Sequence, residues 1–143
     1  MKKITGLIIF VMLTATQLAY GRIDYTYISS ESLMDILKKK QPIHMVDVQK
    51  KNNYLRHHFA HSIGTDAYPV KTGKDTDKIK AILNTLQASD YRIVIIGPRG
   101  TRASQRAYAF LLQQGIAPQR LAILKKGTRG WPAPEIFLNT SGT

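Results

Sequence analysis

The stretch "IVIIGPRGTRAS", at residues 93–104, decides the fold of this chain. Its apolar half is typical of a buried strand, which then passes through a tight glycine-containing loop into the start of a helix. Proteins of the α/β class place anion-binding and nucleophile-bearing turns at such strand-to-helix loops. The first loop position, where a catalytic thiol or hydroxyl would stand, is Gly97. The stretch therefore predicts an anion cradle that lacks a nucleophile.

Further strands and helices alternate on both sides of this stretch. The segments "IHMVDV" at residues 43–48 and "RLAIL" at residues 120–124 read as strands, and "YTYI" at residues 25–28 reads as an edge strand. Apolar residues at helical spacing predict helices over residues 77–88 and 103–114. This alternation predicts an α/β fold, with a parallel sheet and helices on both of its faces.

Residues 1–21 are typical of a signal peptide. Lys2 and Lys3 supply the positive start, residues 8–13 form an apolar run, and residues 19–21 offer a cleavage site. We therefore expect a periplasmic or secreted protein without a stable membrane anchor, although retention of this segment as an anchor is the alternative. The remaining chain is long enough for one domain, which we expect over residues 22–134, followed by a flexible tail over residues 135–143.

Charge and cysteine content restrict the function. The chain has 21 Lys and Arg against 9 Asp and Glu, and a net charge of +10 remains once Lys2 and Lys3 are removed. We expect the partner to be a small oxyanion (sulfate, thiosulfate or phosphate) or an acidic protein, with binding to a polyanion or a membrane surface as the alternative. Aromatic residues do not interleave the basic ones, so nucleic acid is not expected. The chain has no cysteine, which excludes disulfides, thiolate metal sites and thiol catalysis.

Four segments in order resemble the rhodanese family of sulfurtransferases. They are "VDV" at residues 46–48, "YLRHHFAHS" at 54–62, "GPRGTRAS" at 97–104 and "LKKGTRGWP" at 124–132. The third is similar to the active-site loop of that family, C-x-x-G-x-R, and matches it at Gly100 and Arg102. The resemblance implies a rhodanese-like domain over nearly the whole mature chain, of the exported single-domain kind.

The same resemblance shows departures that bear on activity. In this family a cysteine takes sulfur from a donor as a persulfide and passes it on, and the matching position here is Gly97. Gln49 stands where the family has the arginine of D-V-R, and His57 and His61 replace two glycines. The resemblance therefore implies a catalytically inactive homologue without a cofactor. A thiosulfate-type sulfurtransferase, by family membership alone, remains the alternative.

The candidate site is an oxyanion cradle around the loop. Backbone N–H groups, the positive helix end and arginine side chains would hold the anion; the residues are Gly97, Arg99, Gly100, Thr101, Arg102 and Arg106. A turn without a ligand, in which the glycines supply only backbone freedom, is the alternative.

Three residues are expected to support the site. We expect Asp47 to accept hydrogen bonds and neutralise a nearby arginine, His58 to stand where the family has its histidine, and Trp131 to pack in the core or over the loop. No metal site is expected. The alternative is a site formed by two of His57, His58 and His61 together with His44 or Asp66.

Overall fold

The computed structural model describes residues 21–138, which form a five-stranded sheet. The strands are β1 (Tyr27–Ile28), β2 (Ile43–Asp47), β3 (Ile63–Gly64), β4 (Arg92–Ile96) and β5 (Leu121–Leu124). They lie in the order β1-β5-β4-β2-β3, and every neighbouring pair is parallel. The predicted α/β class is confirmed, and the segment 93–96 that decided it lies in the central strand.

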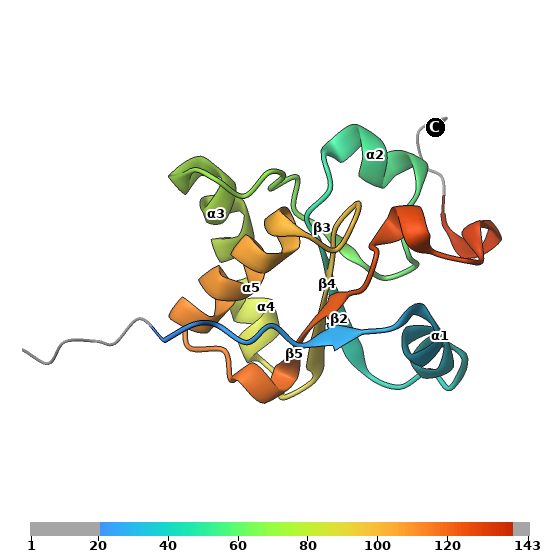
Figure 1. The fold of residues 1–143 in the computed structure, drawn as a ribbon, viewed down its shortest axis with the longest axis horizontal. Coiled ribbons are helices and arrows are strands. Elements are labelled where there is room, and N and C mark those ends of the chain that lie inside the picture. The colour runs from blue at the N-terminus through green and yellow to red at the C-terminus, as the bar shows by residue number, and fades with distance from the viewer. Residues whose placement is uncertain (1–20, 139–143) are drawn as a thin grey trace, which may run out of the picture.

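Helices cover both faces of this sheet (Figure 1). The helix α1 (Ser30–Lys38) lies on one face, and α3 (Gly73–Lys80), α4 (Leu83–Gln87) and α5 (Arg102–Gln113) lie on the other. The short α2 (Lys51–Arg56) follows β2, and single 3₁₀ turns lie at Pro118–Arg120, Thr128–Gly130 and Pro134–Ile136. None of the helices within residues 21–138 is long and apolar enough to span a membrane.

The central strand β4 divides its side chains between two apolar cores because successive residues of a strand point to opposite faces. Ile93 and Ile95 belong to the core under α3, α4 and α5, whereas Val94 and Ile96 belong to the core under α1. All four side chains are fully buried. This burial on both faces explains the continuous apolar run, and it fixes where β4 ends and the loop begins.

The helix predicted over residues 77–88 is wrong in its bounds. The structure has two helices there, α3 and α4, separated at Ala81 and Ile82. The first begins at Gly73 because Thr72 and Asp75 form a capping box. The prediction relied on the spacing of apolar residues and therefore did not take this polar motif into account. Leu83 and Leu86 of α4 remain in the core despite the interruption.

The C-terminal residues up to 138 pack against the domain. Phe137 contacts Phe59 edge-on, with 4.8 Å between the ring centroids, and the backbones of His58 and Leu138 form an antiparallel bridge. Phe137 and Leu138, which the expected tail over residues 135–143 includes, thus lie against the domain, whereas residues 139–143 lie outside the described residues. Residues 1–20, which hold nearly all of the expected signal peptide, lie outside the described residues.

Candidate functional site

The loop that follows β4 interlocks with the loop that follows β5. The N–H of Thr128 donates to the carbonyl oxygen of Gly97 and the N–H of Arg129 donates to that of Pro98, both at 3.0 Å. Gly100 and Gly127 have φ angles of +65° and +59°, a region in which L side chains are strained. A Cβ atom on either glycine would run into the backbone of the other loop. The two loops thus form one rigid unit at the carboxyl ends of the central strands.

The first turn of α5 leaves backbone donors without acceptors. Gln105 is the first residue whose N–H is bonded, to the carbonyl oxygen of Thr101 at 3.0 Å, and the Thr101 side chain makes no capping hydrogen bond. Within residues 21–138 the N–H groups of Arg102, Ala103 and Ser104 have no partner. Unpaired N–H groups at a helix start attract anions, because the helix dipole adds to their partial positive charge.

A cavity of about 530 Å³, here called the basic pocket, opens beside this helix start. Its residues are Tyr68, Pro69, Lys71, Pro98, Arg99, Thr101, Arg102, Ala103, Ser104, Arg106 and Arg129. Five of them are cationic and none is acidic. Among the described residues the ion pairs are Lys39–Asp35 and Lys78–Asp66, so none of these five cations is neutralised by a carboxylate. Within residues 21–138, Arg106 alone of the five donates a side-chain hydrogen bond, from Nη1 to the carbonyl oxygen of Pro69 at 2.9 Å.

Ser104 brings a buried hydroxyl to the basic pocket. The residue is 1% exposed, and its Oγ has no hydrogen-bond partner among the described residues. Buried polar atoms without a partner are rare, because each costs about 1–3 kcal/mol. The hydroxyl also occupies the space that a Cβ atom on Gly97 would need. A side chain at position 97 would therefore collide with Ser104.

The sequence-based candidates divide between the basic pocket and its base. Arg99, Thr101, Arg102 and Arg106 line the pocket as expected. Gly97 and Gly100 are buried beneath it and shape the loop. Sequence reasoning missed Lys71, Ser104 and Arg129. A basic, glycine-rich turn at residues 125–130 was a signal for Arg129, whereas no local pattern marked Lys71.

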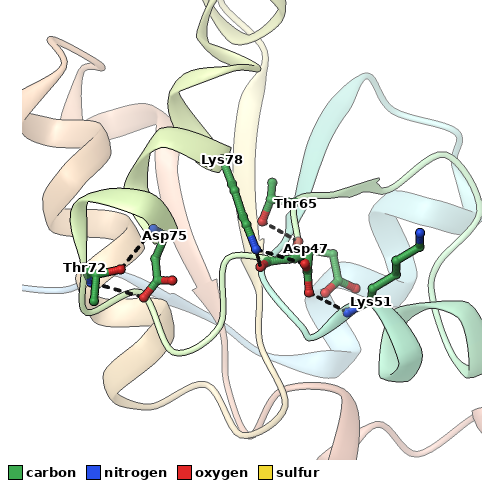
Figure 2. Close-up of polar contacts among 7 residues, drawn as sticks. Asp47, Lys51, Thr65, Thr72, Asp75 and Lys78 are labelled. Atoms are coloured by element: carbon green, nitrogen blue, oxygen red, sulfur yellow. Dashed lines mark hydrogen bonds and ion pairs between the residues drawn. The ribbon is translucent and has the colours of Figure 1, made fainter.

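Asp47 lies at the carboxyl end of β2, fully buried. Its Oδ1 accepts from the backbone N–H of Gln49 at 2.9 Å, and its Oδ2 accepts from Gln49 Nε2 at 3.0 Å. Its carbonyl oxygen accepts from the Thr65 hydroxyl at 3.0 Å (Figure 2). Burial raises the pKa of Asp47 to about 7, although the bonds from Gln49 oppose the shift.

The expectation that Asp47 neutralises an arginine is wrong, because within residues 21–138 its side chain bonds only to Gln49. Gln49 in turn links this carboxyl group to the loops. Its Oε1 accepts from the Thr128 hydroxyl at 3.1 Å, and the Thr128 N–H holds the carbonyl oxygen of Gly97. Asp47 therefore supports the base of the loop unit and does not reach the basic pocket.

His58 and Trp131 also lie away from the basic pocket. His58 stacks on Tyr54 with 4.2 Å between ring centroids, and its Nδ1 is 2.7 Å from the Tyr54 carbonyl oxygen. Trp131 packs edge-on against Phe59, which confirms its expected place in the core. In the described part of the chain no three His, Cys, Asp or Glu side chains come close enough to hold a metal ion.

The parallel sheet and the loop-to-helix pocket at its carboxyl edge define this chain as an α/β protein with a basic, solvent-facing pocket. The profile of the rhodanese-like domain matches residues 29–133. The chain therefore belongs to the rhodanese-like domain family. A search of the curated proteins finds none that matches this chain.

Solved structures of low identity share the fold. A rhodanese-like domain protein from Staphylococcus aureus is 18% identical, with a TM-score of 0.61 over 81% of this chain and 99% of its own. A yeast protein tyrosine phosphatase of the rhodanese family is 16% identical, with a TM-score of 0.63 over 78% and 87%. A thiosulfate sulfurtransferase from Pseudomonas aeruginosa is 17% identical, with a TM-score of 0.59 over 83% of this chain and 20% of its own.

The position of Gly97 allows a direct test of the electrostatics of the loop. Its φ angle lies outside the positive region, so the obstacle to a side chain there is the Ser104 hydroxyl and not backbone strain. We expect the variant Gly97→Cys/Ser104→Ala to fold and to carry a thiol whose pKa lies well below the free value of about 8.5. The helix start and Arg102 would favour the thiolate.

The rate of thiol alkylation against pH measures that pKa. Thr85→Cys, at an exposed position of α4, is the control and should react with a pKa near that of a free thiol. Gly97→Cys alone should be less stable than the double variant by about 1 kcal/mol or more, because it crowds Ser104. A thiol pKa equal to that of the control would show that the loop provides no positive site.

Proposed function

We propose that this protein is a non-catalytic member of its family that binds a small oxyanion (sulfate, thiosulfate or phosphate) in the basic pocket. The observation that carries the proposal is the buried Ser104 hydroxyl at the start of α5, where neither it nor the first three N–H groups of the helix has a partner among the described residues. Arg99, Arg102 and Arg106 line the same pocket, and within residues 21–138 none of the three is paired with a carboxylate. Charge-assisted hydrogen bonds from such groups are the usual means of holding sulfate or phosphate.

Sulfur transfer is not part of this proposal. The family reaction needs a thiol to carry the sulfur, and the chain has no cysteine. Ser104 does not replace it, because its Oγ has no hydrogen bond to a general base. The sulfurtransferase and the phosphatase among the structural neighbours share only the fold with this chain at 16–17% identity. Sulfurtransferase activity would require a nucleophile that this sequence does not contain.

The proposal includes export to the periplasm or secretion, which the pattern of residues 1–21 supports. An acidic segment of a partner protein is the second candidate ligand, since its carboxylates would meet the same unpaired arginines. Association with a polyanion or a membrane surface through the net charge differs in one respect: it would weaken steeply with salt whatever happens to the loop.

Removal of the two loop arginines tests the site. The variant Arg99→Ala/Arg102→Ala should bind sulfate, thiosulfate and phosphate at least tenfold more weakly, because each lost charge-assisted hydrogen bond costs about 1.5–3 kcal/mol. The measurement is the ligand-induced shift in melting temperature, because a ligand that binds only the folded state stabilises it by mass action. A tenfold loss of affinity removes about 1.4 kcal/mol of that stabilisation at saturating ligand.

The control variant Lys38→Ala/Lys80→Ala removes the same charge from exposed positions of α1 and α3. This variant should show the same ligand-induced shift in melting temperature as the parent protein. Equal shifts in all three proteins would contradict the proposed site and favour association through net charge alone.

A further inference from the structure

The basic pocket is larger and more charged than a single oxyanion requires. Its volume of about 530 Å³ lies within the range of about 300–1,000 Å³ that small-molecule sites occupy. A bound water fills about 30 Å³, so one tetrahedral anion would leave most of this space to solvent. Five cations likewise exceed the charge of one sulfate or phosphate. The charge indicates a ligand with more than one anionic group, and the volume is sufficient to hold one.

The cations come from separate segments of the chain. Arg99, Arg102 and Arg106 stand on the loop after β4 and on the first turns of α5, next to Ser104. Lys71 lies just before α3, and Arg129 lies in the loop after β5. We call Lys71 and Arg129 the outer cations. They contribute charge to the pocket without belonging to the helix start that would hold the first anionic group.

Hydrogen bonds fix the backbone that carries Lys71. Its N–H donates to Asp75 Oδ2 at 2.8 Å, and Thr72 and Asp75 close the capping box of α3 (Figure 2). Val70 is 2% exposed in the core, and the side chain of Arg106 holds the carbonyl oxygen of Pro69. Lys71 therefore starts from a fixed backbone position at the rim of the basic pocket.

The backbone of Arg129 is held in a similar way, by the hydrogen bond from its N–H to the carbonyl oxygen of Pro98.

The two carboxylates nearest in sequence to Lys71 already accept hydrogen bonds from other groups. Asp66 accepts from Lys78 Nζ at 2.9 Å and from the Lys51 N–H at 2.8 Å. Asp75 accepts from the N–H groups of Lys71 and Thr72. The outer cations thus remain available to a ligand.

We propose that the basic pocket is adapted to an anion with two or more linked phosphoryl groups, of the pyrophosphate class. One group would lie at the start of α5 with Ser104 and Arg102, and the next would lie between Lys71 and Arg129. This inference rests on the proposed oxyanion site and adds the class of ligand to it. Inorganic polyphosphates and nucleoside diphosphates share the required chemistry.

Calorimetric titration of the parent protein at constant ionic strength tests the inference. The probes are orthophosphate, pyrophosphate, tripolyphosphate and ADP. We expect pyrophosphate to bind at least tenfold more tightly than orthophosphate. The variant Lys71→Gln/Arg129→Gln should lose that advantage while its affinity for orthophosphate stays within twofold of the parent value. The control variant Lys38→Gln/Lys80→Gln, with the same loss of charge, should retain the advantage.

The outcomes separate the two proposals. Equal affinities for orthophosphate and pyrophosphate would overturn this inference and leave the oxyanion site standing. No binding of any of the four probes would overturn this inference and would exclude phosphate as the oxyanion of the proposed site. If ADP binds as tightly as pyrophosphate, the inference is supported with nucleotides as the source of the phosphoryl groups. If pyrophosphate and tripolyphosphate bind more tightly than ADP, the inference is supported with inorganic chains as the source. If both double variants lose the preference for pyrophosphate to the same extent, the preference depends only on net charge, which would contradict the inference.

Discussion

Gly127→Ala should destabilise the protein by about 3 kcal/mol or more and abolish the proposed binding of oxyanions. The φ angle of Gly127 is +59°, where a Cβ atom costs about 1–2 kcal/mol. That Cβ would also collide with the backbone of Gly97, Pro98 and Arg99, and overpacking of this kind adds about 1–3 kcal/mol. Relief of the collision requires the two loops to separate, which would move the start of α5 and Arg129 apart.

Two other glycines provide matched controls, with urea unfolding as the measurement. Gly115 also has a positive φ, +88°, but an added Cβ there meets nothing within 4 Å, so Gly115→Ala should cost only about 1 kcal/mol. Gly73, in the first turn of α3, has no such φ and equally open surroundings, so Gly73→Ala should be neutral or slightly stabilising. Equal losses for Gly127→Ala and Gly115→Ala would show that the loops do not interlock as described.

The buried Asp47 should make the protein more stable as the pH falls from about 8 to about 5. Its folded pKa of about 7 lies above the ordinary value of 3.8, so in this range the folded state binds a proton that the unfolded state does not. The cost of burying the charge is fully present above pH 7 and disappears as the pH falls toward 4. A shift of about three units corresponds to about 4 kcal/mol.

Asp47→Asn should remove this dependence, because asparagine does not titrate. It should stabilise the protein by about 2 kcal/mol at pH 8, since it removes the buried charge but forms a poorer set of hydrogen bonds with Gln49. Other groups also titrate: burial lowers the pKa of His44, and hydrogen bonds lower those of Asp66 and Asp75. Because they are present in both proteins, the difference in free energy of unfolding between parent and variant isolates Asp47.

Urea unfolding between pH 5 and pH 8.5 gives that difference. Asp90→Asn, at an exposed position, is the control and should follow the parent at every pH. If Asp47→Asn gained no stability relative to the parent at high pH, the carboxyl group would be ionised in the folded protein at little cost. The link from Asp47 through Gln49 and Thr128 to Gly97 would then be an ordinary hydrogen-bond chain without a stored electrostatic penalty.

Local patterns in the sequence were sufficient for the order of the elements and for half of the site. The apolar run before Gly97 predicted the central strand because both faces of a parallel sheet are buried, and each residue of that run faces a core. The loop that follows must run directly into its helix, so Arg99, Thr101, Arg102 and Arg106 could be placed together by their spacing alone. The absence of cysteine follows from composition and needs no structure.

Tertiary packing decided what lies opposite those residues. Lys71 and Arg129 line the basic pocket because strand order and loop packing bring their segments to the same edge of the sheet. The spacing of residues within one segment does not predict a contact with another segment. Ser104 faces the space above Gly97 only because the helix packs at that distance from the strand. The pairing of Asp47 with Gln49 and not with an arginine is likewise decided by its surroundings, since burial and hydrogen bonding depend on the whole fold and not on the residue itself.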